Sequence, residues 1–360
     1  PIIPGNQNHT IFLSGERGWF LDADPKAISV EVPSVGLSSE ILPNNSSSLW
    51  RYSARTFHNF NPFALRLGAN INTRDARSYI HSYVKNNSEH NPRFKRANYS
   101  FSARLSHNLS ARSFWNLNVG YRILNDESGD GLWFDNIEAY GDTLANTGFL
   151  APGVRLVQGS RVGLDNVGLF FHRGRVSNSY TKTDNRTLNV DLDFTTQMGK
   201  SLLEVGGGFS YNVLRYFSLA PAAIAIDMRG PNAKSVEYRV AVRQPYFFGF
   251  DVTGKNHAND DVMRVFSEYN DNNDYQVAAA PKNPLIAYAY FQNRYELSDL
   301  VINFGLRMDY FDSKADVLKS EEFPFFGGTD PNDFDAGDFV VKEPEFYLSP
   351  RIGIGFPVTA

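Results

Sequence analysis

Hydrophobic and polar residues alternate along many segments of this chain. In residues 114–123, every second residue from Trp115 to Ile123 is apolar, and the residues between them are mostly Asn, Gly and Arg. Because successive side chains of a β-strand point to opposite faces, this period of two predicts a strand with one apolar and one polar face. Similar alternation predicts about ten strands, over residues 9–20, 49–58, 63–72, 97–106, 114–123, 187–196, 202–215, 285–296, 300–310 and 346–356. Each is long enough to cross a bilayer, which takes roughly 9–11 tilted residues.

The connections between these strands alternate in length. Short turns are predicted near 59–62, 107–111, 198–200 and 297–299. Long segments are predicted at 21–48, 74–94, 125–186, 216–284 and 312–344. Alternating short and long connections are typical of an outer-membrane barrel, in which short periplasmic turns alternate with long extracellular loops.

Two all-β architectures fit the alternation. A soluble antiparallel sheet also alternates, with its apolar face turned toward a protein core. Long loops without structure of their own are uncommon in such a fold. We therefore favour a transmembrane antiparallel β-barrel in a bacterial outer membrane, and we keep a soluble or surface all-β binding or adhesin-like module as the alternative.

Composition narrows the function classes. The 360 residues contain 35 Lys and Arg against 39 Asp and Glu, a formal net charge of −4, so nucleic acid is not an expected partner. The absence of cysteine excludes disulfides, cysteine zinc sites and thiol nucleophiles. Mean hydropathy is −0.35 and no apolar run reaches the length of a transmembrane helix, whereas alternating strands escape such a scan.

No convergent acid, base and nucleophile are visible, so we expect the protein not to be an enzyme. The seven histidines lack the i, i+4 spacing of a helical zinc site, and no G-x-S-x-G elbow occurs. The run Gly206–Gly208 is not followed by a helix pattern, which argues against a phosphate loop. In a strand, these glycines are better explained by relief of crowding or by a bend.

One segment resembles a calcium loop. Asp126, Ser128 and Asp130 place oxygen ligands at alternate positions, and a glycine follows for the turn. The bidentate acid of such a loop belongs at position twelve, which is Ile137, and Glu138 comes one residue late. A plain acidic turn is therefore favoured over a structural calcium site, and no other cofactor is expected.

Seven charged residues occupy the polar phase of predicted strands. In a barrel they would face the lumen, where they would line a transport pathway, hold a plug by ion pairs, or pair with one another. We favour mutual pairing, because charges of both signs are close and solvated pairs cost little. These candidates are Arg104, Arg122, Asp191, Asp193, Glu204, Arg307 and Arg351.

Aromatic residues are frequent in the two longest connections, 125–186 and 216–284. They suit a stacking surface for a glycan or a peptide, and they equally suit packing of the loops on one another. The candidates for ligand binding are Trp133, Phe134, Tyr140, Phe170, Phe171, Tyr246, Phe247 and Phe248.

Several segments resemble the TonB-dependent outer-membrane receptors. Residues 300–311, LVINFGLRMDYF, are close to a recurring NxGLRxDYF strand of that family, and residues 348–358, LSPRIGIGFPV, are close to its LSPRLGxxFPV strand. Residues 281–293 resemble another barrel strand. Residues 1–5 and 11–16 resemble the junction between the plug and the first strand. The most similar type is the Bacteroidota (Oar-type) receptor, which carries an N-terminal carboxypeptidase-regulatory-like domain.

The resemblance implies a transporter that imports a scarce or large nutrient, such as a siderophore, a vitamin, a peptide or an oligosaccharide. Receptors of this family have a TonB box, a plug and twenty-two strands, whereas about ten strands are predicted here. Since barrel diameter grows with strand number, ten strands cannot enclose a plug. We therefore expect residues 1–360 to form part of one barrel domain, its N-terminal half, with the plug and the C-terminal half outside this sequence.

The resemblance also implies partners. The TonB–ExbB–ExbD complex of the inner membrane would act through the missing plug, and outer-membrane lipids would surround the strands. A surface lipoprotein caps the barrel in some related systems, although no residue here points to one. A small passive porin is the remaining alternative.

Overall fold

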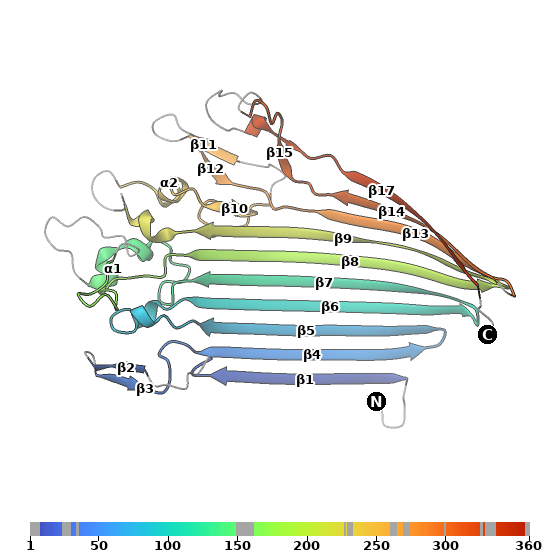
Figure 1. The fold of residues 1–360 in the computed structure, drawn as a ribbon, viewed down its shortest axis with the longest axis horizontal. Helices are drawn as coiled ribbons and strands as arrows, with labels where there is room; N and C mark the ends of the chain where they lie inside the picture. The colour runs from blue at the N-terminus through green and yellow to red at the C-terminus, as the bar shows by residue number, and fades with distance from the viewer. Residues whose placement is uncertain are drawn as a thin grey trace.

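A computed structural model describes residues 8–23, 30–33, 36–148, 162–226, 228, 233–259, 265–268, 274–298, 300–324, 327 and 336–356. The fold is nearly all β and is built on one large antiparallel sheet (Figure 1). Ten long strands follow one another in chain order across this sheet, and the short strand β10 (Tyr246–Phe248) adds to β9. Neighbouring strands along the sheet are therefore also successive long strands of the chain.

All ten predicted strands are confirmed. The long strands are β1 (His9–Phe20), β4 (Ser47–Phe60), β5 (Phe63–Arg77), β6 (Arg93–Ser110), β7 (Ser113–Gly129), β8 (Tyr180–Met198), β9 (Ser201–Leu219), β13 (Leu285–Glu296), β14 (Val301–Asp312) and β17 (Glu345–Gly355). From β5 to β9 they contain 15 to 19 residues, more than a membrane crossing requires. The excess lies mainly at the ends that lead into long connections.

Short turns and long connections lie at opposite ends of the sheet. The turns between β4 and β5, β6 and β7, β8 and β9, and β13 and β14 lie on the right in Figure 1, as do the start of β1 and the end of β17. The long connections lie on the left and carry smaller elements. These are β2 (Val30–Val32), β3 (Leu37–Ser39), α1 (Thr143–Thr147), α2 (Val236–Ala241), β11 (Val265–Glu268), β12 (Asp274–Ala278), β15 (Asp316–Leu318), β16 (Phe339–Val341) and 3-10 turns at His81–Tyr83, Ser88–His90, Ala139–Gly141, Pro221–Ala225 and Ala336–Asp338.

Strand register separates the two faces of the sheet. One row of paired residues runs from Arg104 through Asn118 and Asp191 to Gly208 and Tyr288. We call this side the polar face. The opposite side, the apolar face, exposes large hydrophobic side chains from β1 to β17, among them Leu13, Phe101, Leu192, Phe209, Phe304 and Leu348. Leu192 is 50% exposed and Leu348 is 65% exposed.

The main hydrophobic core lies at the long-connection end, not under the sheet. It joins the outer ends of β8 and β9 to the connections that follow β7 and β9. We call it the loop core, and its buried members are Ile137, Tyr140, Val176, Tyr180, Phe217, Leu219, Ala222, Ile224, Val240, Phe247, Phe250, Val252 and Ala279. A smaller cluster of Val30, Val32, Leu42 and Val84 packs the β2–β3 hairpin.

The described sheet ends at two edge strands, β1, which pairs with β4, and β17, which pairs with β14. Among the described residues, no helix has both the length and the apolarity that a bilayer crossing demands. The segment 1–5, which resembles a plug junction, lies outside the described residues.

Candidate functional site

All seven charged candidates lie on the polar face. Register places Arg104 beside Asn118, and Glu204 between Thr195 and Gln292. The structure brings the candidates onto one surface spanning β6 to β17 without joining them into one cluster. Arg122 receives support from Asn98, whose Oδ1 accepts a hydrogen bond from the arginine Nε at 2.9 Å.

Two carboxylates of this face bind tyrosines across a strand that lies between them. The Tyr288 hydroxyl donates to Asp191 Oδ1 at 2.8 Å, and the Tyr290 hydroxyl donates to Asp193 Oδ1 at 2.8 Å. The tyrosines are on β13 and the aspartates on β8, with β9 between them. The bonds exist because β9 presents glycine at the crossing points.

Gly206 and Gly208 provide that space. A Cβ at Gly206 would lie 2.5 Å from Tyr290 Cε1 and 2.7 Å from Asp193 Oδ1. A Cβ at Gly208 would lie 2.5 Å from Asp191 Oδ1 and 2.6 Å from the backbone oxygen of Val190. The glycine run thus relieves crowding. The sequence analysis did not select Tyr288 and Tyr290 as site residues. Their only signal in the sequence was their spacing of two within the predicted strand 285–296.

The arginine of β14 has its own partners. Arg307 lies 2.8 Å from Asp309 Oδ1, and its guanidinium lies 4.4 Å from the centre of the Tyr288 ring. Asp309 is two residues along the same strand, so this pair is local. Arg307 thus pairs with a residue outside the candidate set, and Asp191 and Asp193 accept hydrogen bonds from tyrosines.

Most of the aromatic loop candidates pack the loops. Tyr140 and Phe247 belong to the loop core, and Trp133 and Phe248 pack against it. Phe134 is buried beneath Lys95, whose Nζ lies 4.5 Å from the ring centre. Phe170 packs against the smaller cluster, and Phe171 contacts Tyr83 edge-on, with ring centres 5.7 Å apart.

Tyr246 differs from these candidates because its side chain is 61% exposed. It borders a cleft of about 530 Å³ that Phe248, Lys282 and Lys314 also line. The ring centre of Tyr246 lies 6.1 Å from that of Phe248, and Lys282 Nζ lies 4.7 Å from the centre of the Phe248 ring. This cleft at the long-connection end offers aromatic faces together with ammonium groups.

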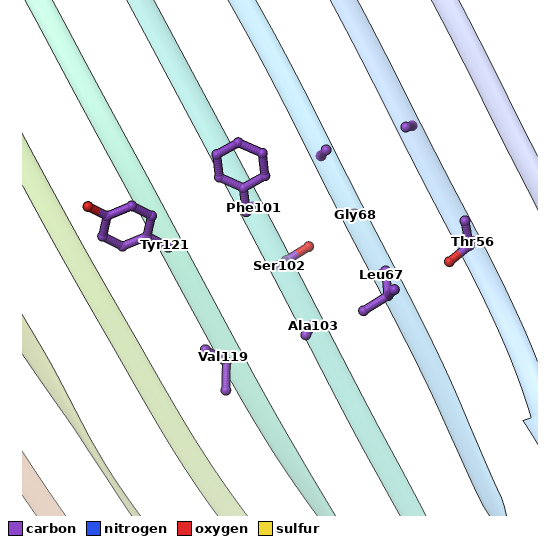
Figure 2. Close-up of a pocket in the computed structure, with 10 residues that line it drawn as sticks. Thr56, Leu67, Gly68, Phe101, Ser102, Ala103, Val119 and Tyr121 are labelled. Atoms are coloured by element: carbon purple, nitrogen blue, oxygen red, sulfur yellow. The ribbon is translucent and has the colours of Figure 1, made fainter.

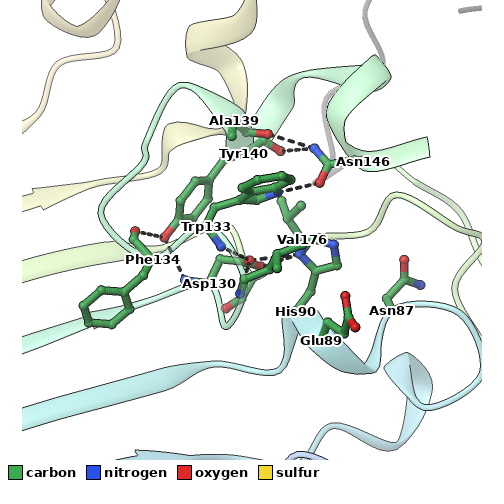
Figure 3. A network of polar contacts seen from close by, with 12 residues as sticks. Asn87, Glu89, His90, Asp130, Trp133, Phe134, Ala139, Tyr140, Asn146 and Val176 are labelled. Carbon is green, nitrogen blue, oxygen red and sulfur yellow. Dashed lines mark hydrogen bonds and ion pairs between the residues drawn. The ribbon is translucent and has the colours of Figure 1, made fainter. Parts of the chain in front are cut away.

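Asp130 organises the buried connection after β7 (Figure 3). Its fully buried carboxylate accepts hydrogen bonds from His90 Nδ1 at 2.9 Å and from the backbone N–H groups of Trp133 at 3.1 Å and Ser177 at 2.9 Å. The Asp130 N–H donates to the Tyr140 hydroxyl at 2.7 Å. Burial raises the pKa of Tyr140 above its ordinary value, so the phenol stays protonated and donates to the backbone oxygen of Phe134.

The three calcium candidates contact protein groups instead of one another. Asp126 forms an ion pair with Arg96, and the Ser128 hydroxyl lies 2.7 Å from that of Thr181. Asp130 is held as described above. No group of three or more acidic or histidine side chains suited to a metal occurs among the described residues. A calcium role for these oxygens stays a prediction.

The apolar face has a shallow hollow of about 380 Å³ (Figure 2). Small residues such as Ala103 and Ala69 leave this space beside the larger side chains of Phe101, Tyr121 and Leu67. The lining is almost entirely apolar, so the hollow suits hydrocarbon contact and offers no set of polar groups for chemistry.

No protein-family model matches this sequence, and no curated protein matches it. Solved structures with a similar course include the copper transporter OprC, at 10% identity over 99% of this chain and 39% of that chain, with a TM-score of 0.45. The outer membrane transporter YddB from Escherichia coli has 8% identity over 98% and 34%, with a TM-score of 0.46. The FrpB iron transporter from Neisseria meningitidis has 13% identity over 98% and 41%, with a TM-score of 0.45. This chain spans about two fifths or less of their length, and the likeness concerns the arrangement of the strands alone.

Proposed function

We propose that residues 1–360 form part of the wall of an outer-membrane β-barrel that imports a nutrient. The observation that carries this proposal is the two-sided, single-layer sheet. Its apolar face is exposed from β1 to β17, while its polar face bears charges and hydrogen-bonded tyrosines. Soluble proteins rarely expose so large a contiguous apolar surface, and bilayer hydrocarbon would cover it.

The division of the two ends supports an orientation. Long connections and the loop core lie at one end of the sheet, and short turns lie at the other. In outer-membrane barrels the long loops are extracellular and the turns are periplasmic. The cleft beside Tyr246 and Lys282 would then face the medium, where a nutrient is first bound.

The strand motifs at 300–311 and 348–358, with their resemblance to TonB-dependent receptors of the Oar type, favour active import over a passive pore. A plug and the second half of the barrel would lie outside these residues. The TonB–ExbB–ExbD complex would then supply energy through the plug. The aromatic and cationic cleft suits a siderophore, a vitamin, a peptide or an oligosaccharide.

Cysteine labelling tests the location and the orientation, because residues 1–360 have no cysteine of their own. Val167, 75% exposed in the connection after β7, and Lys200, in the turn between β8 and β9, are replaced singly by cysteine. We expect a membrane-impermeant maleimide to label Val167→Cys in intact cells and Lys200→Cys only after the cells are opened. The unsubstituted protein is the control for background labelling. Recovery of the protein in the aqueous fraction without detergent, or equal labelling of both variants in intact cells, would contradict the proposal.

A further inference from the structure

Three arginines lie together on the polar face of the first strands. Arg66 on β5 is directly opposite Arg104 on β6, and Arg55 on β4 is opposite Gly68, two residues along β5 from Arg66. Side chains paired in this way have Cβ atoms about 4.5–5.5 Å apart, and diagonal neighbours are within reach of long side chains. Like charges directly opposite one another destabilise a sheet. The arrangement therefore concentrates positive charge at a cost in stability.

No carboxylate of the described residues neutralises this cluster. Other arginines of the same strands are paired: Arg51 lies 3.3 Å from Glu16, and Arg93 lies 2.5 Å from Asp75. Arg55, Arg66 and Arg104 have no ion pair or hydrogen bond in the part of the chain that the structure describes. The Phe57 ring lies 5.4 Å from the Arg66 guanidinium.

The cluster borders a hollow of about 680 Å³ in the polar face. Its floor is made by small residues, Gly68, Ser102 and Gly120, so the arginine side chains stand around open space. A Cβ at Gly68 would lie 2.6 Å from the Ser102 hydroxyl, which shows how closely this floor is packed. The amides of Asn70, Asn118 and Asn189 add further hydrogen-bonding groups.

Among the described residues that line the hollow, Asp191 is the one carboxylate, and it already accepts a hydrogen bond. Register places it beyond Asn118, two strands from Arg104, and its Oδ1 accepts the Tyr288 hydroxyl. The hollow thus combines three guanidinium groups with neutral amides on one side and a hydrogen-bonded carboxylate on the other.

We propose that this hollow binds a small solute carrying carboxylate or phosphate groups. Guanidinium groups present planar pairs of N–H donors that match both anions, and charge-assisted hydrogen bonds are stronger than neutral ones. The proposal that the hollow binds an anion rests on the geometry of the hollow and does not depend on the proposed function. The further step, that such an anion is the transported nutrient or part of it, rests on the proposed function and narrows the substrate class to acidic solutes.

Calorimetric titration of the purified protein in detergent tests the binding, with citrate and inorganic phosphate as probes. We expect saturable binding that weakens as sodium chloride rises, because salt screens exposed charges. The double variant R66Q/R104Q should bind at least tenfold more weakly. The matched control Arg51→Gln removes an arginine from the same strand and face as Arg55, but one that Glu16 already pairs. Its affinity should stay within about twofold of the unsubstituted protein, since Arg51 does not line the hollow.

Thermal unfolding without added anion distinguishes a hollow that is open to solutes from one that acidic side chains of the protein itself fill. If the hollow is open to solutes, removing like-charge repulsion should raise the unfolding midpoint of R66Q/R104Q by about 1–3 °C. A lowered midpoint together with no anion binding would show that acidic side chains of the protein itself fill the hollow, and it would overturn the proposal. Equal binding by the double variant and the unsubstituted protein would also overturn it. Both measurements are made in detergent without transport, so they stand apart from the labelling test of location.

Discussion

At the scale of single residues, the buried carboxylate of Asp130 depends on hydrogen bonds from the surrounding protein. It has no exposed surface, and it accepts hydrogen bonds from His90 and from backbone N–H groups. A hydrogen bond to a charged group contributes about 1.5–3 kcal/mol, and a buried donor that loses its acceptor costs a similar amount. The fold of the connection after β7 therefore depends on this one side chain.

Replacing Asp130 by Asn should loosen that connection without unfolding the sheet. The amide has one acceptor oxygen in place of two, so it leaves donors such as the Ser177 N–H unsatisfied. We expect backbone hydrogen exchange at Leu132, Trp133 and Ser177 to accelerate roughly ten- to a hundredfold, which corresponds to about 1.5–3 kcal/mol. Asp135→Asn, an exposed site in the same connection, should leave exchange unchanged. Equal acceleration in both variants would assign the effect to charge in general.

The aromatic residues of the long connections show where sequence reasoning stops. Alternation gives the face of a strand residue, but a loop residue has no period that reveals its neighbours. Tyr140 and Tyr246 were equivalent candidates in the sequence, yet the structure buries the first and exposes the second. Tyr140 belongs to the loop core, which also contains Ile224 and Phe250 from the connection after β9, so its burial involves residues far away in the sequence.

At the scale of elements, the glycines of β9 allow side chains of β8 and β13 to form hydrogen bonds with each other across β9. Replacing Gly208 by Ala would place a Cβ 2.6 Å from a backbone oxygen, which cannot rotate away. Replacing Gly206 by Ala would meet the far end of the Tyr290 ring, which can move but would lose its bond to Asp193. Overpacking of this kind costs about 1–3 kcal/mol, so both variants should lower the unfolding midpoint in detergent, Gly208→Ala more strongly.

Gly120→Ala is the control for these substitutions, because it lies on the same face of β7 and its Cβ would meet nothing closer than 3.9 Å. Its unfolding midpoint should stay near that of the unsubstituted protein. If Gly120→Ala is as destabilising as Gly208→Ala, the effect comes from the strand backbone, and the tyrosine–aspartate bonds are not the reason for the glycine run.

Strand positions were predictable because successive side chains of each long strand point alternately to the polar face and to the apolar face. The turn-side ends agree to within a few residues; the predicted turn 198–200, for example, matches the break between Met198 and Ser201. The outer ends were underestimated: β8 begins at Tyr180, not at 187. In that extension the side chains pack against connections, as Tyr180 does in the loop core, so the alternation that marks a two-sided strand is lost.

At the scale of the whole molecule, the solvent on the apolar face decides the effect of a charge. Leu192 lies on that face, half exposed, with Leu117 on one side and Gly207 on the other. In a bilayer, Leu192→Arg should cost about 2–4 kcal/mol at mid-depth and reduce the yield of folded protein in the membrane. In water the same change at an exposed position would cost little.

Thr195→Arg, on the polar face of the same strand and opposite Glu204, provides the comparison. Urea unfolding in lipid vesicles should separate the two variants by the bilayer cost. Equal midpoints would mean that hydrocarbon does not cover the apolar face, and the sheet would then have to pack against protein.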